Sequence, residues 1–157
     1  MSTPPATQVR VTRRFASPPE RVFDAWLDPQ RARTFLFSTP AGEIVRAEID
    51  PRVGGTFRIV DRRQGKDVEH VGTYLELERP RRIAFEYSAD HSDRSRVSLD
   101  VVPSGSGSGV TLIHELHPKW ADFAERAHAA WTMMLEKLAA TLGEGAPGAG
   151  GSPSRAA

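Results

Sequence analysis

The chain has no cysteine among its 157 residues, and this absence excludes several kinds of site. A disulfide framework, a thiolate zinc site, an iron–sulfur cluster and a cysteine nucleophile all need thiols. An excess of charge of one sign is lacking too, because 21 Lys and Arg residues are balanced by 20 Asp and Glu residues, for a formal net charge of +1. The sequence therefore gives no electrostatic reason to expect binding to nucleic acid.

Long hydrophobic runs are also missing from the sequence. No apolar stretch approaches the roughly 18–20 residues that a membrane-spanning helix needs. The first seven residues, MSTPPAT, lack the basic and apolar regions of a secretory signal. We therefore expect a cytoplasmic protein without a membrane span.

Both ends of the chain have a low-complexity composition. Residues 143–157 are almost entirely Gly, Ala, Pro and Ser, apart from Glu144 and Arg155. Such a segment buries too little apolar surface to offset the entropy lost on ordering. We therefore expect a disordered tail whose removal leaves the stability unchanged. Residues 1–7 are expected to be a flexible N-terminus, which leaves residues 8–142 as one folded domain.

The domain is expected to begin with a strand and two short helices. Val9, Val11 and Phe15 fall on alternate positions among polar residues, which is typical of a strand. Ser17, two prolines and Glu20 then predict a capping box, in which Ser17 caps a helix and Glu20 reaches back to it. A second short helix is expected over residues 28–37.

Strands and turns dominate the middle of the chain, and a helix ends it. The expected strands are residues 43–50, 56–61, 68–78, 82–87, 94–102 and 110–117. Residues 103–109, rich in Gly and Ser, are expected to be a flexible hairpin tip. The last helix carries one apolar stripe at spacings of three and four residues, formed by Ala124, His128, Trp131, Leu135, Leu138 and Leu142. Gly143 is expected to end this helix.

This order of elements predicts an α+β helix-grip fold. A curved antiparallel sheet with one hydrophobic face must be covered, and only the C-terminal helix is long enough to cover it. The two short helices after the first strand would close one end. Any space left between the sheet and the long helix would be a cavity.

Several stretches of the chain resemble one protein superfamily. They are residues 18–26 with Asp28-Pro29, residues 50–57, residues 72–77, residues 80–85, residues 110–112 leading to His114, and Trp131, Leu135 and Leu138. Together they are similar to the bacterial members of the START-like superfamily (SRPBCC), in the subfamily named after the activator of heat-shock-protein ATPase. The resemblance implies the helix-grip fold but no particular activity, because the bacterial members share no catalytic motif. Phe35-Leu36-Phe37 stands where the family more often has a Trp-Phe pair, which is expected to reshape the cavity mouth.

Two histidines are candidates for chemistry. His114 lies on the apolar face of the last strand and His128 on the apolar stripe of the last helix, so both are expected to face the same interior. Each could be a buried histidine satisfied by a neighbour, or a polar group that meets a ligand oxygen or a reacting proton. A metal site is not expected, because His114 and His117 point to opposite faces of a strand.

The candidate ligand-binding residues are the large side chains expected to face the interior, although core packing alone also explains them. They are Trp26, Phe35, Phe37, Phe57, Phe85, Leu112, His114, His128, Trp131 and Leu135.

Three functions are consistent with these features. The first is binding of a hydrophobic small molecule between the sheet and the C-terminal helix, with no cofactor. The second is a cyclase- or hydrolase-like enzyme that uses His114 or His128 as a general base. The third is an interaction module of a heat-shock ATPase, which ranks last because the chain lacks the extra N-terminal domain of the eukaryotic activators. A homodimer is left open.

Overall fold

The protein folds around a single antiparallel sheet of seven strands, in the order β1-β7-β6-β5-β4-β3-β2. The computed structural model describes residues 7–90 and 94–144. The strands are β1 (Thr7–Phe15), β2 (Gly42–Ile49), β3 (Thr56–Arg63), β4 (Lys66–Glu78), β5 (Arg82–Ala89), β6 (Ser95–Ser104) and β7 (Gly107–Leu116). The first strand along the chain pairs with the last one, which makes β1 an edge strand beside β7.

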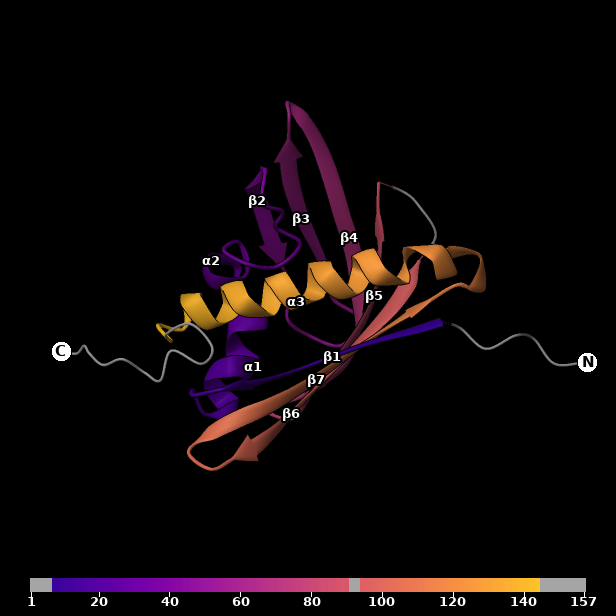
Figure 1. Cartoon of the computed structure of the whole chain (residues 1–157). Helices are drawn as coiled ribbons and strands as arrows, with labels where there is room; N and C mark the ends of the chain where they lie inside the picture. The colour runs from indigo at the N-terminus through magenta and orange to yellow at the C-terminus, as the bar shows by residue number, and fades with distance from the viewer. Residues whose placement is uncertain (1–6, 91–93, 145–157) are drawn as a thin grey trace, which may run out of the picture.

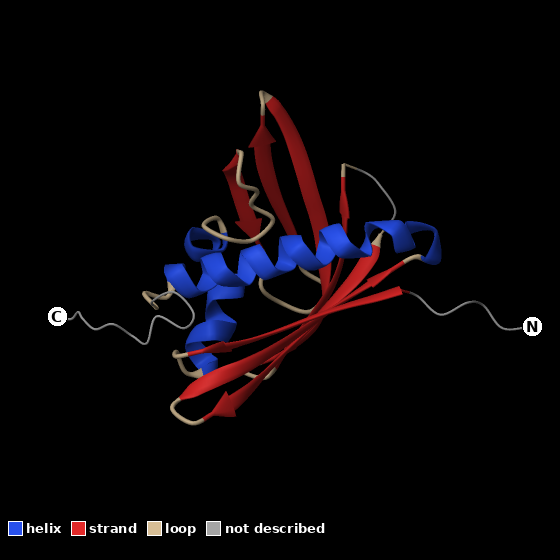
Figure 2. Ribbon diagram, in the orientation of Figure 1, coloured by secondary structure: helices blue, strands red, loops and turns tan. Residues whose placement is uncertain are grey.

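The helices lie before and after this run of strands. They are α1 (Pro19–Leu27), α2 (Pro29–Ala32), the 3-10 helix η1 (Pro118–Phe123) and α3 (Ala124–Thr141). The long helix α3 crosses the face of the curved sheet, and α1 and α2 lie near its C-terminal end (Figures 1 and 2). The predicted helix-grip α+β fold is therefore confirmed.

The start of α1 differs from the prediction. Its N-cap is Pro18, and no side chain caps it. The Ser17 hydroxyl instead donates to a carboxylate oxygen of Glu144 at 2.9 Å. The backbone N–H groups of Ala16 and Ser17 donate to the same carboxylate at 2.8 and 3.0 Å. The predicted capping box between Ser17 and Glu20 is therefore wrong.

The boundaries of the folded domain also differ from the expected ones at both ends of the chain. Gly143 ends α3 with a φ of 81°, as expected, but the next residue, Glu144, contacts the start of α1. The expectation that nothing after Leu142 belongs to the domain is wrong for Glu144. At the other end, Thr7 already pairs with Leu116 in the sheet. The expectations for residues 1–6 and 145–157 lie outside the described residues.

The hairpin between β6 and β7 is tighter than expected. Pairing extends to Ser104 and Gly107, so the predicted flexible tip is largely strand. A side chain at Gly107 would collide with the backbone of Phe15, which explains the glycine there. Ser108 is fully buried, and its hydroxyl donates to the carbonyl of Ser17 at 2.7 Å. The hairpin therefore packs against the segment that leads into α1.

The core lies between the sheet and the helices. Trp26 of α1 contacts Phe35 edge to face, with ring centroids 5.1 Å apart, and stacks beside Trp131 of α3 at 6.4 Å. Trp131, Leu135 and Leu138 are buried, as the helical spacing predicts. Burying each of these side chains stabilises the fold by about 1.5–3 kcal/mol or more.

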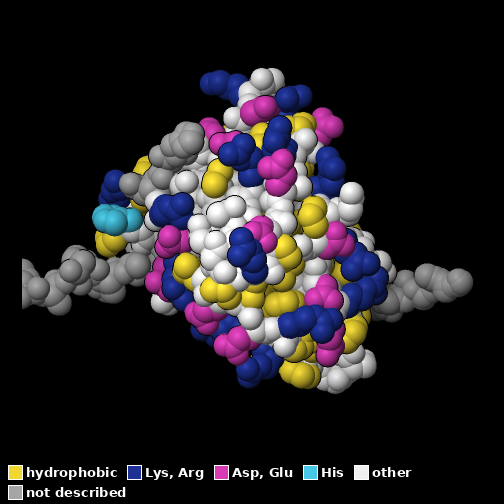
Figure 3. All heavy atoms as spheres, turned by 180° about the vertical axis from the view of Figure 1, so that it is seen from behind, with side chains coloured by type: hydrophobic (Ala, Val, Ile, Leu, Met, Phe, Trp, Pro, Cys, Tyr) yellow, Lys and Arg dark blue, Asp and Glu magenta, His cyan; other side chains and the backbone are white. Residues whose placement is uncertain are grey.

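Charges on the surface are balanced. Basic and acidic side chains are intermixed on the side of the molecule opposite to α3 (Figure 3). Arg82 pairs with Glu76 and Asp100, each at 2.9 Å, across neighbouring strands. In the described part of the chain, no helix is long and apolar enough to cross a membrane.

Candidate functional site

A cavity of about 540 Å³ lies beneath the first half of α3. Its walls come from α3, η1, the loop after α2, and the ends of β3, β4, β5, β6 and β7. The apolar part of the lining includes Phe37, Val68, Tyr87, Leu116, Trp120, Phe123, Ala127, Ala130, Trp131, Met133 and Met134. The polar part includes Ser38, Thr39, Arg63, His70, Ser88, Arg94, Ser95, His114 and His117. This size and this mixture are typical of small-molecule sites.

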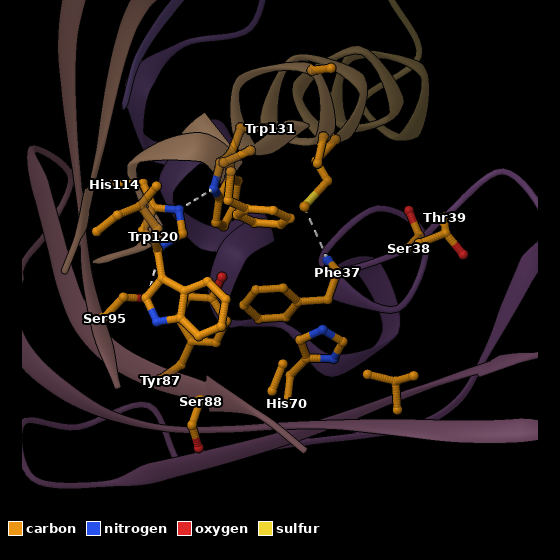
Figure 4. A pocket seen from close by; sticks show the side chains of 18 of the residues that line it. Phe37, Ser38, Thr39, His70, Tyr87, Ser88, Ser95, His114, Trp120 and Trp131 are labelled. Atoms are coloured by element: carbon orange, nitrogen blue, oxygen red, sulfur yellow. Dashed lines mark hydrogen bonds between the residues drawn. The ribbon is translucent and has the colours of Figure 1, made fainter. Parts of the chain in front are cut away.

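Four polar side chains form a row across neighbouring strands at the cavity. His70 lies on β4, Tyr87 on β5, Ser95 on β6 and His114 on β7. Tyr87 is directly opposite Ser95 in the sheet. His70 is two residues before Gly72, the β4 partner of Tyr87, and Ser95 is two residues before Val97, the β6 partner of His114. Because alternate residues of a strand share a face, all four side chains emerge on the inner face. Figure 4 shows them around the cavity.

His114 is held by hydrogen bonds on both ring nitrogens. The indole N–H of Trp131 donates to Nδ1 of His114 at 3.0 Å, and Nε2 lies 2.8 Å from the Ser95 hydroxyl. An indole N–H can only donate, so Nδ1 must be unprotonated and Nε2 must carry the proton. Burial lowers the pKa of His114 to about 4. The residue is therefore neutral near pH 7, in one fixed tautomer.

His70 has the opposite tautomer. Its Nδ1 lies 3.3 Å from the backbone carbonyl of Ile59, which can only accept a hydrogen bond, so Nδ1 carries the proton. Nε2 is then an acceptor, and the hydrogen bond of this ring within the described residues is the one on Nδ1. Burial, assisted by the positive charge of Arg63, lowers the pKa of His70 to about 4. The ring stacks on Phe37, with centroids 4.4 Å apart and planes 8° from parallel.

Tyr87 lies between the two imidazoles. Its ring centroid is 6.3 Å from that of His70 and 5.7 Å from that of His114. Burial raises the pKa of Tyr87, and hydrogen bonding with Ser95 only partly opposes this. The phenol therefore keeps its proton near pH 7 and can donate a hydrogen bond into the cavity.

The loop after α2 places Phe37 in the cavity wall through an unusual backbone conformation. Phe37 has a φ of 59°, a region that bulky residues rarely adopt. Its backbone N–H approaches the Met134 sulfur at 3.2 Å, and its ring meets Trp131 edge to face at 5.7 Å. Such a conformation costs about 1–3 kcal/mol and needs surrounding contacts to hold it. Here α3 and His70 provide those contacts.

Both arginines that line the cavity are ion-paired. Arg63 contacts the fully buried carboxylate of Asp61 at 2.5 Å, and the Thr39 hydroxyl donates to the same carboxylate at 2.9 Å. Arg94 pairs with Glu86 at 3.2 Å. The positive charges at the rim are therefore compensated within the protein.

The structure brings together only some of the residues that the sequence suggested. Phe37, His114 and Trp131 line the cavity. Six others are buried in the adjoining core without lining it, namely Trp26, Phe35, Phe57, Phe85, Leu112 and Leu135.

The expectation for His128 is wrong, because its side chain is exposed and does not line the cavity. Ala127, Trp131 and Met134 form the inner side of α3 there. A residue next to Ala127 is rotated by about 100° around the helix, so His128 points away from it. His114 and His128 therefore do not face one interior.

The sequence interpretation missed His70, Tyr87 and Ser95 as site residues. A signal for His70 was available, because it alternates with Gly72 and Tyr74 on one face of its strand. Ser95 carries no such signal, since its role depends on which strand lies beside it. In the described residues, no cluster of three or more His, Cys, Asp or Glu side chains could hold a metal ion.

Comparisons with known proteins agree with this architecture. A solved structure from Chromobacterium violaceum is 27% identical, with a TM-score of 0.77, over 85% of this chain and 94% of that one. One from Rhodobacter sphaeroides is 20% identical, with a TM-score of 0.79, over 90% and 96%. A protein in the dynemicin biosynthetic locus is 19% identical, with a TM-score of 0.72, over 91% of this chain and 49% of that one.

The last two of these structures show the fold alone. Comparison with curated proteins gives no match. The family model described as "Activator of Hsp90 ATPase homolog 1-like protein" matches residues 16–143, which is most of the chain and includes every strand that lines the cavity. The protein therefore belongs to the family of Activator of Hsp90 ATPase homolog 1-like proteins, within the START-like fold.

Proposed function

We propose that this protein binds a hydrophobic small molecule in the cavity between the sheet and α3. The observation that carries the proposal is the cavity itself, about 540 Å³ of mainly apolar and aromatic lining with a few polar groups on one wall. Burial of apolar ligand surface there would supply about 25 cal/mol per Å². The cytoplasmic location remains a prediction from the sequence, which leaves a homodimer open.

The geometry favours binding over catalysis by the predicted bases. His114 cannot accept a proton on Nδ1 without losing the bond from Trp131, because both groups would then be donors. His128 lies outside the cavity. Neither histidine is thus placed to remove a proton from a bound molecule.

A pocket-filling variant tests the proposal. Ala130 is half-buried and lines the cavity, so Ala130→Trp would occupy ligand space. Ala140 is exposed on the same helix and does not line the cavity, so Ala140→Trp is the matched control. Native mass spectrometry of freshly purified protein should show a bound small molecule in the parent and in the control, and much less in Ala130→Trp. Denaturing extraction would identify it.

Two results would contradict the proposal. One is equal occupancy in the Ala130→Trp and Ala140→Trp proteins, because the ligand would then bind elsewhere. The other is the absence of binding by the parent protein, both of co-purified molecules and of added aromatic probes.

A further inference from the structure

Of the two imidazoles in the row of His70, Tyr87, Ser95 and His114, only His70 has a ring nitrogen without a hydrogen bond from the described residues. His114 uses Nδ1 for Trp131 and Nε2 for Ser95, so it offers nothing to a ligand. His70 uses only Nδ1, toward Ile59, and its ring lines the cavity. Nε2 is not among the buried polar atoms that lack a partner in the described residues, so it is open to the cavity, where a ligand donor can bond to it.

The charges around the cavity favour a neutral ligand. Arg63 is paired with Asp61 and Arg94 with Glu86, so an anionic ligand would compete with carboxylates already in place. A cationic ligand would meet the Tyr87 hydroxyl and the neutral imidazoles in the lining. The nearby Asp61 carboxylate could not pair with it freely, because it is already bound to Arg63 and Thr39. Transfer of an unpaired charge into such a site is costly.

The shape of the wall favours a flat ring. Phe37 and His70 are stacked nearly parallel, and Tyr87 tilts by 41° against Phe37 at 4.7 Å. Trp120 and Trp131 enter the lining from η1 and α3, and Figure 4 shows their rings around the same space. Aromatic side chains contact aromatic ligands through offset stacking and edge-to-face geometry, which adds to the burial of apolar area.

We propose that the cavity selects a neutral aromatic molecule that carries a hydroxyl group, and that this hydroxyl donates a hydrogen bond to Nε2 of His70. The inference rests on the proposed function and names the ligand class for that site. In this arrangement His70 selects the ligand hydroxyl, and Tyr87 and the other aromatic side chains enclose the ligand ring. His114 fixes the position of α3 through its hydrogen bond with Trp131.

A matched pair of fluorescent probes tests this selection. 1-Hydroxypyrene has the donor hydroxyl, and 1-methoxypyrene has the same ring system without the donor. The parent protein should bind 1-hydroxypyrene about 10-fold more tightly, as expected for one hydrogen bond inside the cavity. His70→Phe keeps a ring against Phe37 but removes Nε2, so its preference should fall to about one. His128→Phe makes the same substitution outside the cavity and should keep the 10-fold preference.

A second measurement needs no variant. The ¹⁵N resonance of His70 Nε2 in the parent protein should move upfield on addition of 1-hydroxypyrene and stay in place with 1-methoxypyrene. Equal affinity for both probes, or a preference that survives in His70→Phe, would overturn the inference while leaving hydrophobic ligand binding intact. Failure of both probes to bind would overturn it as well. If a co-purified ligand were also missing, the proposed function would fail with it.

Discussion

The indole N–H of Trp131 donates to Nδ1 of His114 across 3.0 Å and thereby connects α3 to β7 at the wall of the cavity. The same indole ring stacks beside Trp26 in the core, 6.4 Å away. One side chain thus contributes to the packing of the domain and sets the tautomer of a cavity histidine. Ligand binding and stability are expected to be coupled at this position.

Replacement of Trp131 by Phe should separate these two contributions. Trp131→Phe keeps an aromatic ring but leaves the buried Nδ1 of His114 without its donor, which costs about 1–3 kcal/mol. Trp26→Phe is the matched control, because the buried Trp26 indole N–H has no partner among the described residues. Urea denaturation should therefore show a larger loss of unfolding free energy for Trp131→Phe. Equal losses would mean that the Trp131–His114 bond contributes nothing.

Complete removal of the Trp131 ring should be far more costly. Trp131→Ala should lower the unfolding free energy by about 3–5 kcal/mol if the ring is packed as a core residue. A smaller loss together with changed probe binding would indicate that the cavity side of the ring dominates. Both quantities can be measured on one preparation, by denaturation and by 1-hydroxypyrene titration.

Acid should destabilise the protein through its two cavity histidines. The pKa values of His70 and His114 are both lowered from 6.5 to about 4 in the folded state. The unfolded chain therefore binds more protons between these values, and stability falls as the pH drops from about 6.5 to about 4. Each histidine contributes up to about 3 kcal/mol to this loss.

The measurement is urea denaturation at several pH values within that window. Nearby charges also act on His70, because Arg63 lowers its pKa while Asp61 and Asp90 raise it. The His70→Phe variant isolates the contribution of the imidazole, since it lacks the titrating group. Its stability should fall with acid about half as steeply as that of the parent over the upper part of the window. An unchanged slope would show that His70 is not held neutral.

Truncation at the C-terminus should show that Glu144 contributes to the stability of the domain. The Glu144 carboxylate accepts three hydrogen bonds from Ala16 and Ser17. A chain that ends at Gly143 should therefore be less stable than one that ends at Glu144, by about 1–3 kcal/mol. Thermal melting of the two truncated chains makes the comparison. Identical melting temperatures would show that the contacts of Glu144 contribute nothing to stability.

The role in the family's description can be tested directly. We predict that the protein does not stimulate the ATP turnover of a bacterial heat-shock ATPase, because we propose that its cavity binds a small molecule. The assay is steady-state ATP hydrolysis with increasing protein, and Ala130→Trp serves as a variant with a filled cavity. Saturable stimulation at micromolar protein, equal for both chains, would favour the interaction module instead.

The sequence by itself determined the order of elements and the inner faces of the strands. Val110, Leu112, His114 and Leu116 are buried and alternate with partly exposed residues, which is the period of a half-buried strand. This pattern is local, so it can be read without knowledge of the neighbouring strands. The long amphipathic C-terminal helix and its end at Gly143 follow from equally local signals.

Only the tertiary structure decided which polar groups meet. His70 and His114 are far apart in the chain. They reach one cavity because only β5 and β6 lie between β4 and β7 in the sheet. The rotation of α3 about its own axis decides whether His128 or its neighbour Ala127 faces the interior. The apolar spacing in the sequence leaves this choice between adjacent residues open, and the docking of α3 settles it. Glu144 likewise has no local signal, because its partners at Ala16 and Ser17 come close only when both ends of the domain are folded.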